Sequence, residues 1–335
     1  MLIRIARAWE ITAREITAEH DFLGRRRFLS LAGRAVAGAA AAALTGAPAR
    51  ALADPAIAGG ADPLGSVDRD SPCADLYPAE RSAAYRIDRP LTDEIVAATH
   101  NNFYEFTPKK KVVWRLAGEL RTRPWTLELA GLCSNPGMHD VDDLVRRIGL
   151  EERVYRHRCV EAWAMAVPWT GFELRKLIEI AAPTSKARYV RFVSFLDRDA
   201  APGQKVIDYP WPYHEALTVE EATSGLTLLA TGIYGHELPA QHGAPIRLVV
   251  PWKYGFKSAK SIRRIEFLEE RPLTFWHEVV PSEYGFVANV RPDVPHPRWS
   301  QATEEMIGTG TVRPTLMYNG YADAVAHMYP PVTSG

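Results

Sequence analysis

The chain has 335 residues, of which 47% are hydrophobic and 24% are charged, a composition typical of globular proteins and sufficient for one large domain or two smaller ones. Its 40 basic and 40 acidic side chains balance, so it has neither the basic excess of a nucleic-acid-binding protein nor an acidic tail. The 25 prolines favour long irregular connections between strands over a helical bundle.

Residues 1–53 carry the features of an export signal in the expected order. Residues 24–29 (Gly-Arg-Arg-Arg-Phe-Leu) resemble the twin-arginine motif, and an alanine-rich apolar stretch follows at 35–44. That stretch, about 10 residues long, suits a signal, whereas a membrane helix needs about 20. Cleavage sites of the small-x-small form stand at 51–53 and 47–49. The alternative, a short amphipathic helix with arginines, does not explain this order. Because the twin-arginine route exports folded proteins, often with a cofactor already bound, we expect a periplasmic protein.

Removal of residues 1–53 takes away eight basic and four acidic side chains and leaves 32 and 36, a net charge near −4 that suits a soluble periplasmic protein. The periplasm is oxidising, so Cys73 and Cys133 could form a disulfide and leave Cys159 free, although nothing in the sequence decides this. The chain has no Cys-x-x-Cys-His haem motif and no closely spaced cysteines for an iron–sulfur cluster.

The rest of the chain predicts an α+β fold, because strands and short helices mix without a strict βαβ order. We expect an irregular arm over 54–90 and one domain over 91–335. Residues 99–106, polar and aromatic together, predict a pocket-lining loop. Strands are expected at 124–132, 153–155, 189–195, 226–234, 246–251, 262–268 and 314–318. Helices are expected at 141–148, 172–181 and 217–222. Turns are expected at 167–171 and 241–245, and a loop at 203–212. The dinucleotide fingerprint, the P-loop and the His-Glu-x-x-His motif are missing from the sequence.

The most informative stretch is 155–163 (Tyr-Arg-His-Arg-Cys-Val-Glu-Ala-Trp). Cys159 follows Arg156, His157 and Arg158, cations that favour the thiolate, which is the form that binds metals. A thiolate suits a soft or high-valent metal better than calcium or magnesium. For any lone cysteine, however, a buried structural role is the more frequent one.

Four segments and the leader together carry a family resemblance. The segments are residues 101–106 (Asn-Asn-Phe-Tyr-Glu-Phe), 158–163 (Arg-Cys-Val-Glu-Ala-Trp), 251–257 (Pro-Trp-Lys-Tyr-Gly-Phe-Lys) and 296–304 (His-Pro-Arg-Trp-Ser-Gln-Ala-Thr-Glu). In this order they resemble the MsrP family, the catalytic subunits of periplasmic protein-methionine-sulfoxide reductases, over nearly the whole chain. The resemblance implies a single-domain, sulfite-oxidase-type molybdopterin-binding fold of mixed sheets and short helices.

The resemblance also implies a molybdenum–molybdopterin cofactor, with Cys159 as the protein ligand of the metal and the pterin dithiolene and oxo or hydroxo groups as the others. The pterin pocket implied by the family consists of Asn101, Tyr104, Glu105, Ser194, His242, Arg247, Ser258, Ala259 and Lys260. Arg247, Lys257 and Lys260 would bind the cofactor's phosphate, while the alternative for the lysines is a solvated face. Ser194 and His242 stand where the family pattern has threonine and asparagine, which leaves the individual pterin hydrogen bonds open.

Sulfite oxidation is the alternative activity within this fold. Sulfite oxidases follow their ligand cysteine with Ala-Gly-Asn-Arg and gather arginines around the dianion, whereas here Val-Glu-Ala-Trp follows Cys159. A Glu161 carboxylate ~4 Å from sulfite would repel it by about 4 kcal/mol at an effective dielectric of ~20, and a neutral sulfoxide would feel no such repulsion. Aromatic side chains such as Trp163 and Tyr104 suit a thioether.

The implied reaction is oxygen-atom transfer from a methionine sulfoxide in another periplasmic protein. Glu161 is a candidate proton donor, or else a residue that orients the loop. Because the chain has no haem or cluster motif, its electrons must come from a partner, and the resemblance implies the haem-bearing membrane protein MsrQ, which draws on quinols. The length leaves no room for the immunoglobulin-like dimerisation domain of sulfite oxidases, so we expect a monomeric catalytic subunit. The alternative of a different class is a cofactor-storing protein without turnover.

The first prediction concerns export. Replacement of Arg25, Arg26 and Arg27 by lysine should retain the protein in the cytoplasm, because lysine does not reproduce the arginine fork. Cell fractionation measures this, and normal periplasmic delivery of the triple variant would refute the twin-arginine interpretation.

Overall fold

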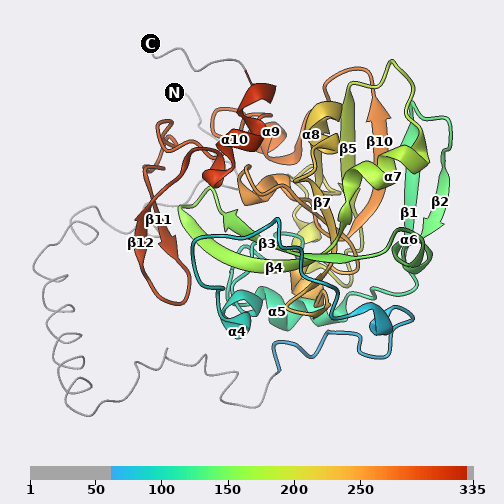
Figure 1. Ribbon diagram of the computed structural model, residues 1–335, viewed down its shortest axis with the longest axis horizontal. Helices are drawn as coiled ribbons and strands as arrows, with labels where there is room; N and C mark the ends of the chain where they lie inside the picture. Colours follow the sequence, from blue (N-terminus) through green and yellow to red (C-terminus); the bar gives the residue numbers. More distant parts are fainter. Residues whose placement is uncertain (1–61, 330–335) are drawn as a thin grey trace, which may run out of the picture. The chain divides into compact units, whose positions relative to one another are not determined.

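The computed structural model describes residues 62–329 (Figure 1). The predicted export signal and residues 54–61 of the predicted arm lie outside the described residues. Residues 62–90 form turns and one 3₁₀ turn (Ala74–Leu76), and the described residues all belong to one compact unit. Within 62–329 no helix is both long and apolar enough to cross a membrane.

One of the two β-sheets has five strands in the order β2-β1-β10-β5-β6. Its strands are β1 (Thr126–Gly131), β2 (Gly137–Asp140), β5 (Tyr189–Ser194), β6 (His214–Thr218) and β10 (Ile262–Leu268). Apolar side chains alternate along the central strands, and the inward members, almost fully buried, form the core: Leu127, Leu129, Val190, Phe192, Ile265 and Phe267. Only β1 and β10 run parallel, so this sheet is mixed.

The second sheet has seven strands, with β12-β11-β4-β7-β8 in order, β3 beside β4 and β9 beside β7. Its strands are β3 (Glu151–Arg158), β4 (Trp163–Glu173), β7 (Leu228–Ile233), β8 (His236–Glu237), β9 (Arg247–Val249), β11 (Thr303–Met306) and β12 (Val312–Pro314). The hairpin of β3 and β4 is central to this sheet, and the loop between them holds Cys159 (Figure 1).

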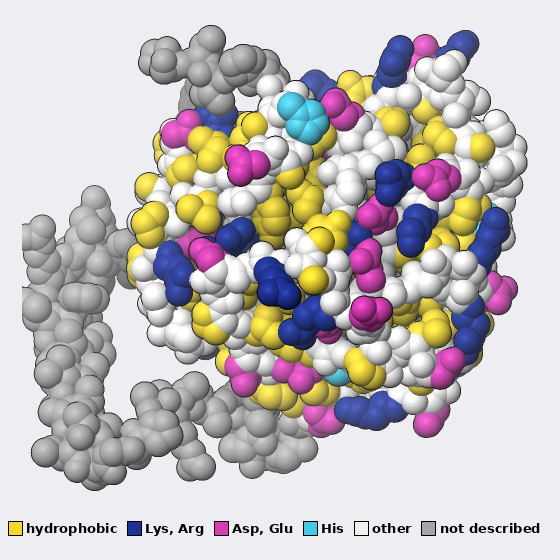
Figure 2. Space-filling view, in the orientation of Figure 1, with side chains coloured by type: hydrophobic (Ala, Val, Ile, Leu, Met, Phe, Trp, Pro, Cys, Tyr) yellow, Lys and Arg dark blue, Asp and Glu magenta, His cyan; other side chains and the backbone are white. Residues whose placement is uncertain are grey.

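The described helices are short. They are α4 (Glu94–Ala98), α5 (Val113–Leu116), α6 (Val141–Ile148), α7 (Leu174–Ala181), α8 (Val219–Thr223), α9 (Phe275–Val279) and α10 (Ala322–Val325). The ends of α6 follow from its sequence: the Asp140 carboxylate accepts hydrogen bonds from the first-turn N–H groups, and Gly149, at φ 80°, ends the helix. Basic and acidic side chains are interspersed over the face shown in Figure 2, in keeping with the balanced net charge.

The α+β class with mixed sheets is confirmed, as are most predicted elements. The expected turn at 167–171 is wrong, because these residues lie inside β4. That strand is buried along nearly its whole length, so its apolar residues run on without the alternation that marks a half-buried strand. Pro168 has no N–H to donate, but its carbonyl still takes part in the pairing of β4 with the end of β7, accepting from Tyr234 N–H at 3.1 Å.

Two further expectations need correction. The last strand is not at 314–318: β12 ends at Pro314, and a 3₁₀ helix occupies Met317–Gly320. The helix expected at 217–222 begins only at Val219, and the residues before it form β6, which the sequence analysis missed. Cys73 and Cys133, whose pairing was left open, are free thiols in the structure.

Candidate active site

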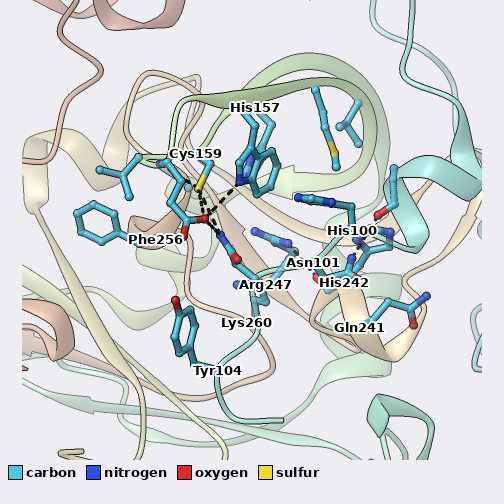
Figure 3. A pocket seen from close by; sticks show the side chains of 18 of the residues that line it. His100, Asn101, Tyr104, His157, Cys159, Gln241, His242, Arg247, Phe256 and Lys260 are labelled. Atoms are coloured by element: carbon cyan, nitrogen blue, oxygen red, sulfur yellow. Dashed lines mark hydrogen bonds between the residues drawn. The ribbon is translucent and has the colours of Figure 1, made fainter. Parts of the chain in front are cut away.

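A pocket lies where three parts of the chain meet: the loop after α4, the end of β3 with the loop that follows it, and residues 241–260 (Figure 3). The sequence-predicted residues that line it are Asn101, Tyr104, Glu105, Cys159, Glu161, His242, Arg247 and Lys260. Three segments that are far apart in sequence therefore contribute to one site, as the family resemblance implied. Gly203 packs against the Tyr104 and Glu105 carbonyls so closely that a Cβ there would clash, and this contact holds the loop after α4 in place.

The alternation of β3 decides which side chains face the pocket. His157 and Cys159, two residues apart, both line it, whereas Arg156 and Arg158 point to the other side. The Arg156 guanidinium pairs with Asp88 at 2.8 Å, and the fully buried Arg158 pairs with Glu304 at 3.3 Å. Arg158 still lowers the pKa of the Cys159 thiol, as expected, but burial and the charge of Glu161 outweigh this effect.

Cys159 is instead a protonated thiol when no metal is bound. Burial, and then the charge of Glu161, raises the pKa of its thiol to about 12. Two N–H groups are aimed at the sulfur: the Glu161 backbone amide at 3.4 Å and Asn102 Nδ2 at 3.3 Å. A metal ion at Sγ would replace the thiol proton, because coordination deprotonates a thiol outright.

Glu161 lies beside the sulfur, and three donors hold its carboxylate. Lys110 Nζ donates to Oε1 at 3.0 Å, while Asn102 Nδ2 and Trp163 Nε1 donate to Oε2 at 3.1 and 3.4 Å. Burial alone would raise the pKa of Glu161, but these hydrogen bonds outweigh it and the pKa lies below its usual value. Lys110 and Asn102 were missed from the sequence. Lys110 stands in a run of three lysines that looks like a solvated surface, while Asn102 follows the predicted Asn101 directly.

Two cations, Arg247 and Lys260, also line the pocket (Figure 3). Arg247 is 3% exposed, donates from Nη1 to the His242 carbonyl at 2.9 Å, and lies over the Trp169 ring. Among residues 62–329, no carboxylate forms an ion pair with Arg247 or with Lys260. Burial lowers the pKa of Arg247 to about 9, and it also lowers the pKa of Lys260 and raises that of the neighbouring Glu105.

Several buried polar atoms of the pocket also lack a hydrogen-bond partner within the described chain. They are His100 Nε2, Asn101 Oδ1, Asn102 Oδ1 and His242 Nε2. Buried polar groups are normally paired, so this concentration indicates that a polar ligand completes them. Together with Arg247, and with Lys260 whose charge also interacts with the Glu105 carboxyl, the donor set fits an anionic, polar group such as a pterin with a phosphate.

Other predicted residues lie behind the pocket wall. Ser194 Oγ donates to the Lys260 carbonyl at 2.7 Å, Ser258 Oγ accepts from Val250 N–H at 3.3 Å, and Ala259 is buried. They support the wall, and their contact with the pterin stays a prediction. Lys257 does not face the pocket: its Nζ lies 2.6 Å from Glu215, and both side chains are buried. A buried lysine needs such a partner, so Lys257 is not free for a phosphate.

An aromatic wall and a histidine were missed from the sequence. The Tyr104 ring lies 4.9 Å from Trp276, which lies 5.3 Å from Tyr284, which lies 5.2 Å from Phe256, and all four line the pocket. His157 also lines it, and burial, then the charges of Arg247 and Lys260, lowers the pKa of His157 to about 3. The strand alternation with Cys159 was the signal that could have found this histidine.

Within 62–329 no three His, Cys, Asp or Glu side chains are grouped as a metal site. A molybdenum ion at Cys159 would take further ligands from its cofactor. A pterin dithiolene would supply two sulfur ligands of the soft kind that matches a thiolate.

Residues 115–276 match the protein family described as "Oxidoreductase molybdopterin binding domain". The chain contains an oxidoreductase molybdopterin-binding domain. The match begins in α5 and ends in α9, so it includes Cys159, Arg247 and Lys260 but neither the loop after α4 nor the C-terminal residues. The matched residues thus form a molybdopterin-binding oxidoreductase domain, in keeping with the mixed α+β fold of the sulfite-oxidase type and with a molybdenum–molybdopterin cofactor.

Among solved structures, the chain is similar to the sulfane dehydrogenase SoxCD from Paracoccus pantotrophus, with a TM-score of 0.40 and 16% sequence identity. The similarity covers 63% of this chain and 60% of the SoxCD chain.

The second prediction concerns acid stability of the cofactor-free protein. Burial, and then the charge of Arg247, lowers the pKa of His242 to about 3, against 6.5 for a free histidine. The folded chain therefore binds fewer protons than the unfolded chain, and stability falls as the pH drops from about 6.5 toward 3. At pH 5 the loss from His242 is about 2 kcal/mol. His242→Asn should reduce the drop in Tm between pH 7 and pH 5 by about 5 °C.

Thermal unfolding followed by circular dichroism at both pH values measures this difference. His327→Asn is the matched control, since His327 is exposed, and it should leave the drop unchanged. An equal drop in His242→Asn and in the parent protein would show that His242 is not held neutral.

Proposed function

We propose that this oxidoreductase reduces methionine sulfoxide in other proteins to methionine, with Cys159 as the protein ligand of the molybdenum. The observation that carries the proposal is the set of side chains around Cys159. There the aromatic wall of Tyr104, Trp276, Tyr284 and Phe256 offers a surface for a thioether. The charged pair of Lys110 and Glu161 beside it has no net charge, which suits a neutral sulfoxide.

Sulfite oxidation is less well supported, because a dianion needs uncompensated cations beside the ligand. Arg156 and Arg158, the arginines nearest to Cys159 in sequence, are turned to Asp88 and Glu304. The sequence-based argument changes here, however: Lys110 neutralises Glu161, so the carboxylate alone does not repel sulfite by the full amount expected. Selectivity then depends on the balance between Lys110 and Glu161, which makes that pair the object of the test.

The net reaction consumes two electrons and two protons: the S–O bond breaks, the sulfoxide becomes a thioether, and the oxygen leaves as water. When bound, the molybdenum centre supplies the two-electron chemistry of oxygen transfer. The Lys110 and Asn102 hydrogen bonds hold the pKa of Glu161 below its usual value, which favours Lys110 over Glu161, the donor suggested by the sequence. Its Oε1 instead orients Lys110 Nζ, whose ammonium donates the proton. Lys110 is 27% exposed, so solvent can return the proton.

We further propose that the catalytic chain is a monomer, exported folded to the periplasm, and that a haem-bearing membrane partner of the MsrQ type supplies the electrons from quinol. The support is the twin-arginine pattern of residues 24–29 and the lack of haem and cluster motifs in the sequence. An electron-transfer assay between the purified protein and membranes that contain such a partner tests this directly.

The third prediction addresses the charged pair. Lys110→Met should slow sulfoxide reduction by ~10²-fold, because it removes the proton donor, and should exclude sulfite further, because Glu161 is left uncompensated. Glu161→Gln should also slow sulfoxide reduction, since Lys110 loses its orienting carboxylate, but should raise sulfite oxidation, since the lysine charge is now free. Steady-state rates on both substrates measure these opposite effects.

Lys109→Met is the matched control, because it removes a neighbouring exposed lysine, and it should keep both parent rates. Unchanged sulfoxide turnover in Lys110→Met would reduce this lysine to a structural partner. Efficient sulfite oxidation by the parent enzyme would overturn the proposed substrate.

The fourth prediction concerns the ligand. Cys159→Ser should abolish turnover and leave the fold and the pterin largely in place, because much of the cofactor's binding comes from Arg247, Lys260 and the unpaired polar atoms. Cys133→Ser is the control and should remain active. Wild-type turnover in Cys159→Ser with molybdenum bound would show that Cys159 is not the ligand. Molybdenum in the parent protein without turnover, even with a chemical reductant, would favour a cofactor-storing role.

A further inference from the structure

The loop that holds Cys159 is a thin partition between two cavities. We define residues 159–162 as the ligand loop. Val160 lines both the pocket of the active site and a second cavity of about 510 Å³ on the far side. The apolar cluster around the loop is small, with Cys159, Val160, Tyr254 and Val290 as its buried members. Packing alone is therefore a weak restraint on this loop, and hydrogen bonds must hold it.

Two of those hydrogen bonds are local: Cys159 N–H donates to the Trp163 carbonyl at 2.9 Å, and Ala162 N–H donates to the Cys159 carbonyl at 3.2 Å. Others come from residues 299–305, more than a hundred residues away in sequence, which we define as the clamp segment. Trp299 Nε1 and Gln301 Nε2 both donate to the Val160 carbonyl, at 2.8 and 2.7 Å. The Glu305 backbone N–H donates to the Ala162 carbonyl at 2.9 Å, where β11 begins its pairing with β4. The clamp segment thus binds two carbonyls of the ligand loop.

Arg158 connects the two segments. Its Nη1 donates to the Cys159 carbonyl, and its Nη2 donates to Gln301 Oε1 at 2.8 Å and to the Thr303 carbonyl at 3.2 Å. Its charge is balanced by Glu304 at 3.3 Å, and the side chains of Arg158, Gln301 and Glu304 are all buried. Charge-assisted hydrogen bonds of this kind are stronger than neutral ones, so the network is rigid where the packing is thin.

The direction of these bonds matters for the sulfur. The carbonyls of Val160 and Ala162 accept from the clamp segment, and that of Cys159 accepts from Arg158. The Glu161 N–H faces Cys159 Sγ at 3.4 Å. Ala162 adopts a left-handed conformation at φ 66°, which an alanine adopts only when its surroundings impose it. The restraint from behind therefore orients both Cys159 and Glu161 toward the pocket.

We propose that Trp299 and Gln301 are positioning residues for the metal ligand: through the Val160 carbonyl they fix the direction of the Cys159 sulfur and of the Glu161 carboxylate. The inference rests on Cys159 as the molybdenum ligand in the proposed function, and it does not depend on which substrate is reduced or oxidised. Groups of this kind, one shell out from a metal, typically affect metal affinity or activity by about 10–100-fold.

Trp299→Phe tests the inference with little disturbance. The change removes the indole donor to Val160 and keeps an aromatic ring next to His296. In the parent protein the His296 and Trp299 rings are stacked, with their centroids 3.8 Å apart. We expect the electron paramagnetic resonance spectrum of the partly reduced holoenzyme to change and its midpoint potential to shift, with kcat down ~10-fold and KM within about twofold. Gln301→Leu, which removes the donor to Val160 and the acceptor for Arg158, should have the larger effect and lower the molybdenum content.

Trp125→Phe is the matched control. It removes an indole-to-carbonyl hydrogen bond of the same length, 2.8 Å to Ile262, in the other sheet. It should lower Tm about as much as Trp299→Phe and leave the spectrum and the potential unchanged. The inference is overturned if both clamp variants behave like the control. They would then have a lower Tm but the spectrum, midpoint potential and molybdenum content of the parent protein, and the clamp segment would be only structural.

The same measurements separate this inference from the proposed function. A parent enzyme that contains molybdenum but oxidises sulfite would refute the proposed substrate, while altered spectra in the clamp variants would still support the positioning role.

Discussion

The burial of positive charge without a protein partner is the constraint on which this site depends. Arg247 is almost fully buried, its pKa is lowered to about 9, and no described carboxylate pairs with it. A protein without a ligand would be more stable with an apolar residue there. An anionic cofactor would offset this unfavourable burial. Lys260 and the unpaired polar atoms of Asn101 and His242 are further groups in the pocket that such a cofactor could bind.

The pocket therefore combines two kinds of chemistry. Arg247 and Lys260 suit the anionic part of a cofactor, and the aromatic side chains near Cys159 suit a substrate side chain. The ligand loop is held by hydrogen bonds from Trp299 and Gln301 and packs against a small apolar cluster. In the proposed function, this firm placement would fix the direction of the Cys159 sulfur toward the metal.

Most of the fold could be predicted from the sequence where local patterns were clear. The helix α6 and the strand β10 have the periodicities that their environments require, and both lie where they were expected. The strand β4 could not be recognised, because burial on both faces removes the alternation that marks a strand, and Pro168 looked like a turn. Strand alternation alone predicts that the Arg156 and Arg158 side chains point away from the side that Cys159 faces. Their proximity to Cys159 in sequence was nevertheless given more weight.

The candidate site was less predictable, because its decisive contacts join distant parts of the chain. Lys110 reaches Glu161 across 51 positions, and nothing local distinguishes it from its neighbouring lysines. The segment 296–304 was recognised as part of a family pattern, yet its contacts with the ligand loop became visible only in the folded chain. The wall of Trp276 and Tyr284 was missed for the same reason.

The raised pKa of the Cys159 thiol has a consequence for the protein before its cofactor arrives. Peroxides and disulfides react with thiolates, and a buried thiol with a pKa near 12 has almost none at neutral pH. Without its cofactor, the chain therefore carries Cys159, the proposed metal ligand, in a form that reacts slowly with oxidants. Coordination of a metal would displace the thiol proton, so the sulfur would be protected from irreversible oxidation until the cofactor is bound.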